Sequence, residues 1–160
     1  MTQIAKENLQ KEIEKLHARN ELSKNITENY FEPGMMEFLE QSEGLWNKET
    51  GEILIRFEAK GTRYEGRTEQ IEKLKVGDNL QIVRDNTNKY NQNNFKILAR
   101  REQNVGNLPA ELCNAMAPLY DNQKLMINDC SVSYVEPISK RSRHASQAIL
   151  FVEVKARLID

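Results

Sequence analysis

Histidine, cysteine and the known catalytic motifs are scarce or missing in this chain of 160 residues, which argues against several classes of function. The two histidines, His17 and His144, stand at opposite ends of the sequence, so a histidine acid–base pair would need a coincidence of folding. The two cysteines, Cys113 and Cys130, have no second thiol pair, and we expect small buried apolar residues rather than a disulfide or a metal site. No phosphate-binding Gly-x-x-x-x-Gly-Lys loop or Gly-x-Ser-x-Gly turn occurs. We therefore expect no enzyme, no cofactor and no metal.

Long hydrophobic runs are missing too. The apolar stretches are only a few residues long, too short to span a bilayer. The first residues mix acidic and basic side chains and contain no apolar core of the kind that a secretory signal needs. Together with the low cysteine content, this predicts a soluble protein of the reducing cytoplasm with no membrane partner.

Neither sign of charge is in large excess. The chain has 23 Lys and Arg against 24 Asp and Glu, a net charge of −1, which argues against broad electrostatic capture of nucleic acid. The sum hides an asymmetry, because residues 1–50 carry 6 basic and 10 acidic residues, net −4, whereas residues 51–160 carry 17 and 14, net +3. A local basic site on the second part is therefore compatible with the composition. The acidic first part is either a neutral spacer or a cover over that site.

Two parts of different periodicity meet after residue 44. Within residues 1–44, Leu9, Ile13 and Leu16 recur at helical spacing, which predicts an amphipathic helix that ends near Asn20. A second, short helix is expected before residue 45. A stripe this narrow usually packs on its own domain, and the alternative is a homodimer formed through the N-terminal helices.

Residues 45–160 alternate apolar and polar side chains over segments typical of β-strands. The strand near the C-terminus is the clearest, because every second residue from Ala148 to Leu158 is apolar. Two helices interrupt the strands, at residues 68–75 and 109–120. The pattern predicts one mainly β domain, a small closed or nearly closed barrel decorated by two short helices. The expected strands cover residues 52–61, 79–84, 94–100, 124–134 and 148–158.

One connection between predicted strands has an unusual composition. The segment from Arg84 to Asn94 contains five asparagines, one lysine and Tyr90. It is not a calcium loop, because Tyr90 stands where a glycine is required and Lys96 where a bidentate glutamate is required. Asparagine side chains can close turns on their own backbone, with Tyr90 as a hydrophobic lid, or they can bind the polar edges of a ligand. Both interpretations are open at this stage.

Two further segments combine charges that suit a nucleic acid. Tyr64 is flanked by Arg63 and Arg67, and an aromatic ring beside guanidinium groups offers a surface for a base and a fork for a phosphate. The run from Lys140 to His144 is the densest basic cluster in the sequence. It is either a solvated loop or a phosphate clamp beside the mouth of the barrel.

These segments, in their order along the chain, resemble the HIRAN domain family. The resemblance rests on Arg63-Tyr64, on the motif Arg-x-x-x-Asn-x-Tyr-Asn-x-Asn that begins at Arg84, and on Val-Gly-Asn-Leu-Pro at residues 105–109. It covers about residues 50–160 and leaves residues 1–44 outside. It implies an OB/SH3-like β-barrel of about six strands with short helices, a fold that occurs both alone and fused to ATPases and nucleases.

The resemblance also implies a function. In this family such a domain holds the 3′ end of single-stranded DNA and stacks two aromatic rings on the terminal bases, and Tyr64 and Tyr90 match these rings. Asn107 matches a histidine that contacts the strand. Asn91 replaces an acidic residue that holds the 3′-hydroxyl, and Ala110 replaces a lysine that binds phosphate. The candidate binding residues are Arg63, Tyr64, Arg84, Asn88, Tyr90, Asn91, Asn93 and Asn107, with Lys89, Lys140, Arg141 and Arg143 as candidate phosphate contacts.

Two other functions remain open on the sequence alone. The barrel is alternatively an SH3-like module that holds a peptide in an aromatic and asparagine-lined groove, or an accessory subunit of a DNA-processing ATPase or nuclease. A salt series separates the first from nucleic-acid binding, because log K for a single strand falls by roughly 0.7 per tenfold rise in salt for each neutralised phosphate.

Overall fold

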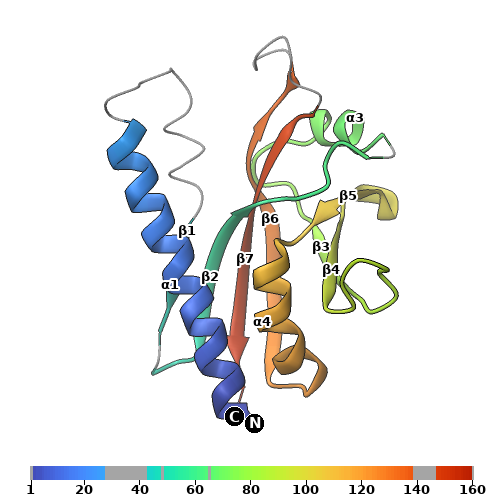
Figure 1. Cartoon of the computed structure of the whole chain (residues 1–160). Helices are drawn as coiled ribbons and strands as arrows, with labels where there is room; N and C mark the ends of the chain where they lie inside the picture. The colour runs from blue at the N-terminus through green and yellow to red at the C-terminus, as the bar shows by residue number, and fades with distance from the viewer. Residues whose placement is uncertain (1, 28–42, 48, 65, 139–146, 160) are drawn as a thin grey trace.

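The computed structural model describes residues 2–27, 43–47, 49–64, 66–138 and 147–159, with the backbone alone at residues 2, 17–27 and 43–46 (Figure 1). From residue 43 onward, strands hold more of the described residues than helices do. The elements are α1 (Thr2–Thr27), β1 (Glu43–Trp46), β2 (Glu52–Glu58), α3 (Arg67–Glu72), β3 (Gln81–Asp85), β4 (Asn94–Leu98), the 3-10 turn η1 (Arg100–Glu102), β5 (Asn104–Asn107), α4 (Ala110–Asp121), β6 (Leu125–Glu136) and β7 (Ile149–Leu158).

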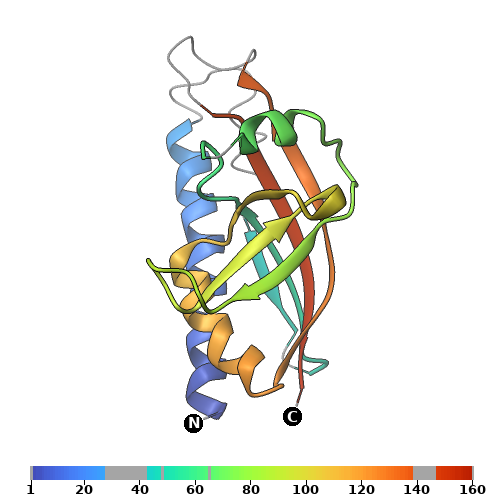
Figure 2. The same cartoon turned by 90° about the vertical axis from the view of Figure 1, so that its right-hand side faces the viewer.

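The strands form two antiparallel sheets, one in the order β1-β2-β7-β6 and one in the order β3-β4-β5. Figure 2 shows the three-stranded sheet lying across the four-stranded one. Two isolated bridges join the sheets: Lys60 pairs with Asn107, and Asn79 pairs with Ser131. The strands therefore form a ring in the order β2, β7, β6, β3, β4 and β5. The ring has two weak joins, one at each isolated bridge. The predicted mixed fold, mainly β with short helices and an N-terminal helix, is confirmed.

Strand β7 lies at the centre of the larger sheet and shows why the sequence forms a strand there. It pairs with β2 on one side and with β6 on the other, so that Val154 stands between Ile55 and Cys130. Leu150, Val152 and Val154 are buried, as the alternating pattern predicts. Burial of such a continuous apolar face is the main stabilising contribution of this sheet.

Helix α1 is part of the same hydrophobic core as the strands. Leu9, Ile13 and Leu16 are buried within it, and α1 packs against α4 and β1. The helix continues to Thr27, beyond the predicted end near Asn20. The expected second helix falls largely on residues 28–42, outside the described residues. Strand β1 starts at Glu43 and so spans the predicted boundary after residue 44.

Two short strands escape the sequence analysis, β1 and β5, because four residues are too few for an alternating pattern to stand out. A tight turn that ends at Gly51 joins β1 to β2. The Asn47 side-chain oxygen accepts hydrogen bonds from the backbone N–H groups of Glu49 and Thr50, and Gly51 has φ of +77°.

Both cysteines are buried free thiols, as expected. Burial raises the pKa of Cys113 to about 11 and that of Cys130 to about 12, so both stay protonated near neutral pH. Among the described residues, no cluster of three or more His, Cys, Asp and Glu side chains is arranged to hold a metal ion. No described helix has the length and apolar character needed to cross a membrane.

Candidate functional site

The segment that carries Arg63 and Tyr64 is fixed to the barrel by two buried threonines. The Thr62 hydroxyl donates to the carbonyl of Ala148 at 3.2 Å, and the Thr68 hydroxyl donates to the carbonyl of Thr62 at 3.0 Å. The backbone N–H of Ala148 donates in turn to the Thr68 hydroxyl at 3.3 Å. Because these polar groups are satisfied inside the core, the short stretch between β2 and α3 has one defined position.

Tyr64 projects from this stretch and is 51% exposed. The Arg63 guanidinium lies over the Tyr64 ring, with Cζ 5.1 Å from the centroid, and its Nη2 donates to the phenolic oxygen at 3.0 Å. This hydrogen bond lowers the pKa of Tyr64 and raises the pKa of Arg63. The pair presents an aromatic face with a fixed positive charge to solvent.

Three side chains converge on Gly61, which has a φ of +68°. A Cβ atom at Gly61 would lie 3.1 Å from Nη1 of Arg67, 3.1 Å from Nδ2 of Asn107 and 3.6 Å from the Tyr64 ring. Arg67 also donates from Nη1 to the Gly61 carbonyl at 2.9 Å, whereas its buried Nε has no partner among the described residues. The sequence places Arg67 three residues after Tyr64 as a guanidinium that suits a phosphate, although the candidate residues that the family resemblance implies do not include it.

The asparagine-rich loop between β3 and β4 is held by its own side chains. The Asn88 side-chain oxygen accepts from the N–H groups of Tyr90 at 2.9 Å and Asn91 at 3.1 Å, and the Asn91 side-chain oxygen accepts from the N–H of Asn93 at 3.0 Å. These are the turns expected if asparagines fold a loop on its own backbone. The structural interpretation of the loop is therefore confirmed for Asn88 and Asn91.

Asn114 on α4 ties the same loop to the helix. Its side-chain oxygen accepts from Nδ2 of Asn91 at 3.1 Å and from Nδ2 of Asn93 at 3.2 Å. Nothing in the sequence signals this partner, because it lies more than twenty positions away on an exposed face of a helix. The amides of Asn91 and Asn93 are thus already engaged before any ligand binds.

Arg84 has a structural role in this arrangement. Its Nε and Nη2 donate to the two carboxylate oxygens of Asp121, each at 3.0 Å, and its Nη1 donates to the carbonyls of Gln92 at 2.6 Å and Asn94 at 3.2 Å. The guanidinium also lies over the Phe95 ring, 5.5 Å from its centroid. Four of the five guanidinium N–H groups are used, so Arg84 holds the loop to the end of α4 and keeps one N–H, on Nη2, for a further partner.

A partly buried chain of polar groups connects the loop with the Tyr64 segment. Nδ2 of Asn94 donates to Asp85 at 3.2 Å and to the side-chain oxygen of Asn107 at 3.0 Å. Partial burial opposes ionisation of Asp85, but hydrogen bonds from Thr87 and Asn94 outweigh it and lower its pKa. Asn107 also pairs through its backbone with Lys60, just before Gly61. In Figures 1 and 2 the two segments lie on the same side of the molecule.

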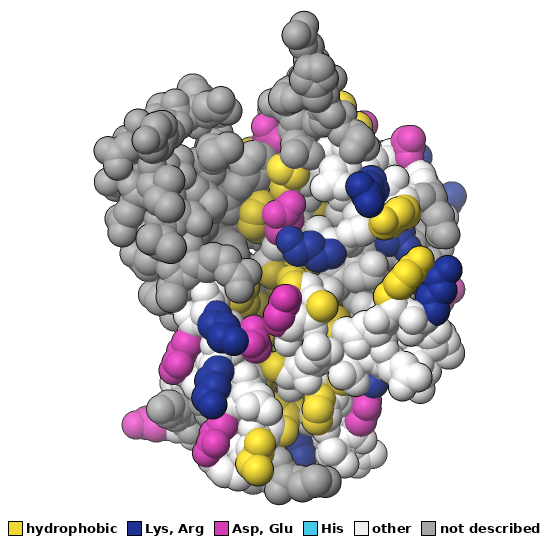
Figure 3. Space-filling model, in the orientation of Figure 1, with side chains coloured by type: hydrophobic (Ala, Val, Ile, Leu, Met, Phe, Trp, Pro, Cys, Tyr) yellow, Lys and Arg dark blue, Asp and Glu magenta, His cyan; other side chains and the backbone are white. Residues whose placement is uncertain are grey.

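Tyr90 stands at the tip of the loop and is 85% exposed, so it is not the hydrophobic lid of the structural interpretation. The Lys89 ammonium lies over its ring, 5.0 Å from the centroid. In Figure 3, basic and hydrophobic side chains lie next to each other on the side of this face that carries β4, β5 and the loop. Both predicted aromatic residues are therefore solvent-exposed rings, each with a cation over one face.

The predicted residues divide into three groups. Arg63, Tyr64, Lys89 and Tyr90 are exposed and free to meet a ligand. Arg84, Asn88, Asn91, Asn93 and Asn107 make hydrogen bonds that build the scaffold around them. Lys140, Arg141 and Arg143 lie outside the described residues.

Comparison with known proteins identifies the family of the domain. The family model of the HIRAN domain matches residues 53–152. No curated protein matches the chain significantly. A structure of a protein from Lactobacillus plantarum, 17% identical, aligns with a TM-score of 0.50 over 69% of this chain and 100% of its own. At this identity the likeness concerns the fold alone.

Two structures of the HLTF HIRAN domain also align. The crystal structure of the human domain is 20% identical over 66% of this chain and 76% of its own, with a TM-score of 0.49. The structure of the HLTF HIRAN domain in its DNA-bound conformation is 21% identical over 66% and 75%, with a TM-score of 0.41. Since the family model covers more than half of the sequence, the chain belongs to the HIRAN domain family.

Proposed function

We propose that this chain is a non-catalytic module that binds single-stranded DNA at or near its 3′ end. HLTF, which carries a HIRAN domain, has a structure in a DNA-bound conformation, and family membership suggests the same class of ligand here. The observation that carries the proposal is the pair of exposed tyrosines, each beside a cation, on segments joined by a partly buried polar chain.

Stacking explains how a chain with a net charge of −1 would bind nucleic acid. A base that stacks on an aromatic side chain contributes about 1–3 kcal/mol, whatever its sequence. Tyr64 and Tyr90 would each take one base, and Arg63, Arg67 and Lys89 would meet neighbouring phosphates. Two stacked bases and a few phosphate contacts give affinity in the micromolar range without a basic surface over the whole molecule.

Asn91 bears on the selectivity for a free 3′-hydroxyl. Its amide is neutral, and both its oxygen and its nitrogen already make hydrogen bonds, to Asn93 and Asn114. A neutral hydrogen bond contributes about 0.5–1.5 kcal/mol, so a 3′-hydroxyl would be preferred over a 3′-phosphate by about tenfold at most. The variant Asn91→Asp should strengthen this preference, because a carboxylate accepts a stronger hydrogen bond from a hydroxyl and repels a phosphate.

Fluorescence anisotropy with a short labelled single strand tests the proposal. Tyr64→Ala and Tyr90→Ala should each weaken binding roughly 5- to 150-fold, the equivalent of one lost stacking contact. The matched variants Tyr64→Phe and Tyr90→Phe keep the ring and should bind nearly as the parent does. Log K should fall with log salt by roughly 0.7 for each phosphate contacted.

Strands with a 3′-hydroxyl or a 3′-phosphate and a blunt duplex complete the experiment. Absence of binding to all three at low salt would reject the proposal. Equal affinity of the alanine and phenylalanine variants would reject stacking as its mechanism, and affinity that does not change with salt would point to a ligand other than nucleic acid.

A further inference from the structure

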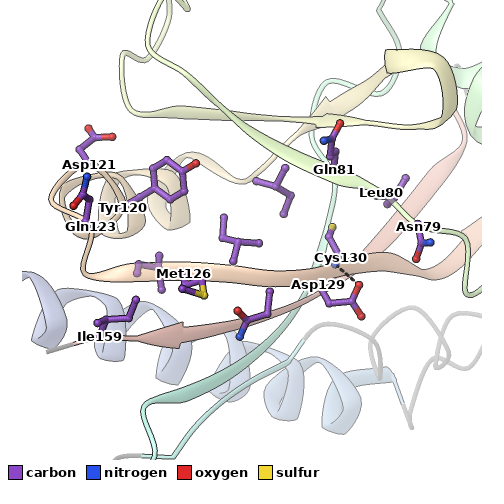
Figure 4. A pocket seen from close by; sticks show the side chains of 14 residues that line it. Asn79, Leu80, Gln81, Tyr120, Asp121, Gln123, Met126, Asp129, Cys130 and Ile159 are labelled. Atoms are coloured by element: carbon purple, nitrogen blue, oxygen red, sulfur yellow. Dashed lines mark hydrogen bonds between the residues drawn. The ribbon is translucent and has the colours of Figure 1, made fainter.

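A groove of about 860 Å³ opens between β3, the end of α4 and β6, and neither Tyr64 nor Tyr90 lines it. Figure 4 shows Tyr120, Asp121 and Gln123 at one end of the groove and Asn79, Asp129 and Cys130 at the other. It lies at one of the two weak joins of the barrel, where β3 and β6 meet through the bridge between Asn79 and Ser131. A volume of this size is in the range of sites that bind ligands in proteins.

The two strands beside the groove are edge strands, each at the end of its sheet. Near the bridge they are joined by backbone hydrogen bonds, such as that from Leu80 N–H to the Cys130 carbonyl at 2.9 Å. Further along β6, within the described residues, no backbone hydrogen bond joins residues 125–129 to β3. The pairing of β6 with β7 also shifts register between Ile127 and Asp129. The edge of β6 thus offers N–H and C=O groups that water or another strand must satisfy.

The side chains of the groove suit a partner with apolar residues. Met126 is 51% exposed, and Ile82, Tyr120 and Ile127 are only partly buried along the same surface. An extended peptide that adds to a sheet edge places alternate side chains into such a surface. Backbone groups and apolar contacts together favour a polypeptide, since a nucleic acid has no backbone N–H groups with which to extend a sheet.

The charge of the groove also disfavours nucleic acid. Among the described residues that line it there is no Lys, Arg or His, and there are two carboxylates, Asp121 and Asp129. Asp121 is bound by Arg84, whereas Asp129 makes no ion pair with any described residue and accepts only the N–H of Cys130. The segments that carry Tyr64 and Tyr90 have the opposite charge, since they contain Arg63, Arg67 and Lys89. A phosphate would be repelled here and a cationic side chain attracted.

We propose that the groove binds an extended segment of a partner protein, which adds as a strand to the free edge of β6, sets apolar side chains against Met126 and places a Lys or Arg beside Asp129. Because the groove does not contain Tyr64 or Tyr90, this binding is separate from the proposed nucleic-acid site and does not depend on it. The protein would then hold a nucleic acid and a second protein on different surfaces.

The test uses the full chain and a display library of random peptides of about ten residues, the length of a long strand. Peptides selected on the chain should share apolar residues at alternate positions and a Lys or Arg. The tightest of them, made with a fluorescent label, should slow amide hydrogen exchange within residues 126–129 at those N–H groups that point away from β7, because these groups would then bond to the added strand.

Three variants locate the binding. Met126→Arg should weaken the labelled peptide at least tenfold, because it places a bulky cation on the apolar surface. Asp129→Asn keeps an oxygen for the Cys130 N–H but removes the charge, and should weaken the peptide by roughly threefold to tenfold. Val76→Arg, at an exposed apolar residue outside the groove lining, is the matched control and should change nothing. All three should bind a single-stranded oligonucleotide as the parent does.

Several results would overturn the proposal. One is a library that gives no peptide able to slow exchange at residues 126–129, and another is a selected peptide whose affinity Met126→Arg leaves unchanged. Exchange that slows with protein concentration in the absence of peptide would show that a second copy of the chain occupies the edge. Slower exchange on addition of an oligonucleotide would show that the groove belongs to the nucleic-acid site.

Discussion

At the scale of single residues, the same side-chain types serve two purposes on this surface. Arg63 and Arg84 both lie over aromatic rings, at 5.1 Å from Tyr64 and 5.5 Å from Phe95. The first ring is exposed and the second is buried, so the first pair faces solvent and the second supports the loop. Exposure of the ring, rather than the presence of an arginine, separates a ligand contact from a structural one.

Arg84→Ala tests this distinction. The substitution removes two hydrogen bonds to Asp121 and two to loop carbonyls, and should lower the free energy of unfolding by about 2 kcal/mol. Asp121→Ala should cost less, below about 1 kcal/mol, because the Asp121 carboxylate is half exposed. Lys89→Ala serves as the control and should stay within about 0.5 kcal/mol of the parent. Urea unfolding measures all three.

The opposite result has a clear meaning. If Arg84→Ala keeps the parent stability but loses affinity for a single strand, Arg84 contacts the ligand directly. The hydrogen bonds to Asp121 and the loop would then be exchanged for bonds to phosphate on binding.

At the scale of elements, the turn between β1 and β2 is closely matched to the end of β7. Gly51 has a φ of +77°, and a Cβ atom there would lie 2.7 Å from the carbonyl oxygen of Leu158. Leu158 donates its N–H to the Gly51 carbonyl at 2.8 Å, so the turn also continues the pairing with β7. A glycine is required here both by its backbone angle and by the close approach of another strand.

Substitution of two glycines separates these requirements. Gly51→Ala should destabilise the protein by about 3 kcal/mol, because the added methyl group meets a backbone atom that cannot rotate away. Gly77 has a φ of +91°, but a Cβ there would meet nothing within 4 Å. Gly77→Ala should therefore cost only the backbone strain, about 1 kcal/mol. Thermal unfolding of both variants compares them, and equal losses would show that backbone angle alone matters.

At the scale of the whole molecule, α1 belongs to the body of the protein. Leu9 is 1% exposed and lies in one core cluster with residues of the strands and of α4. This packing limits how one can test whether the acidic N-terminal part covers the binding site. Deletion of residues 1–44 would remove core side chains together with the start of β1, so a change in affinity after deletion would not report on a cover alone.

Point substitutions in α1 give a cleaner measurement. Leu9→Ala should lower the free energy of unfolding by about 2–5 kcal/mol, as expected for a buried leucine replaced by alanine. Ile4→Ala in the same helix is the control, since Ile4 is exposed and should stay within about 0.5 kcal/mol. Chemical unfolding should show one transition in which helix and strand signals coincide. A separate transition for α1, with the strands unaffected by Leu9→Ala, would show an independent arm.

Local patterns in the sequence predict the elements with a clear period and indicate the family. Neighbouring residues are enough to specify some features of the fold. These are the alternation in β2 and β7, the apolar spacing in α1 and α4, and the turn at Gly51. The resemblance to the family rests on Arg63-Tyr64 and on the motif around Tyr90, and these two segments supply both exposed tyrosines. These features depend on residues that are close together in the chain.

Which candidate side chains remain free depends on how distant parts of the chain pack together. Arg84 is bound by Asp121, and Asn91 and Asn93 by Asn114, through partners more than twenty positions away. No local pattern specifies such pairs, because they depend on where α4 packs against the loop. The groove between β3 and β6 also depends on tertiary structure. These two strands are far apart in the sequence, and the groove lies where they do not pair along their full length.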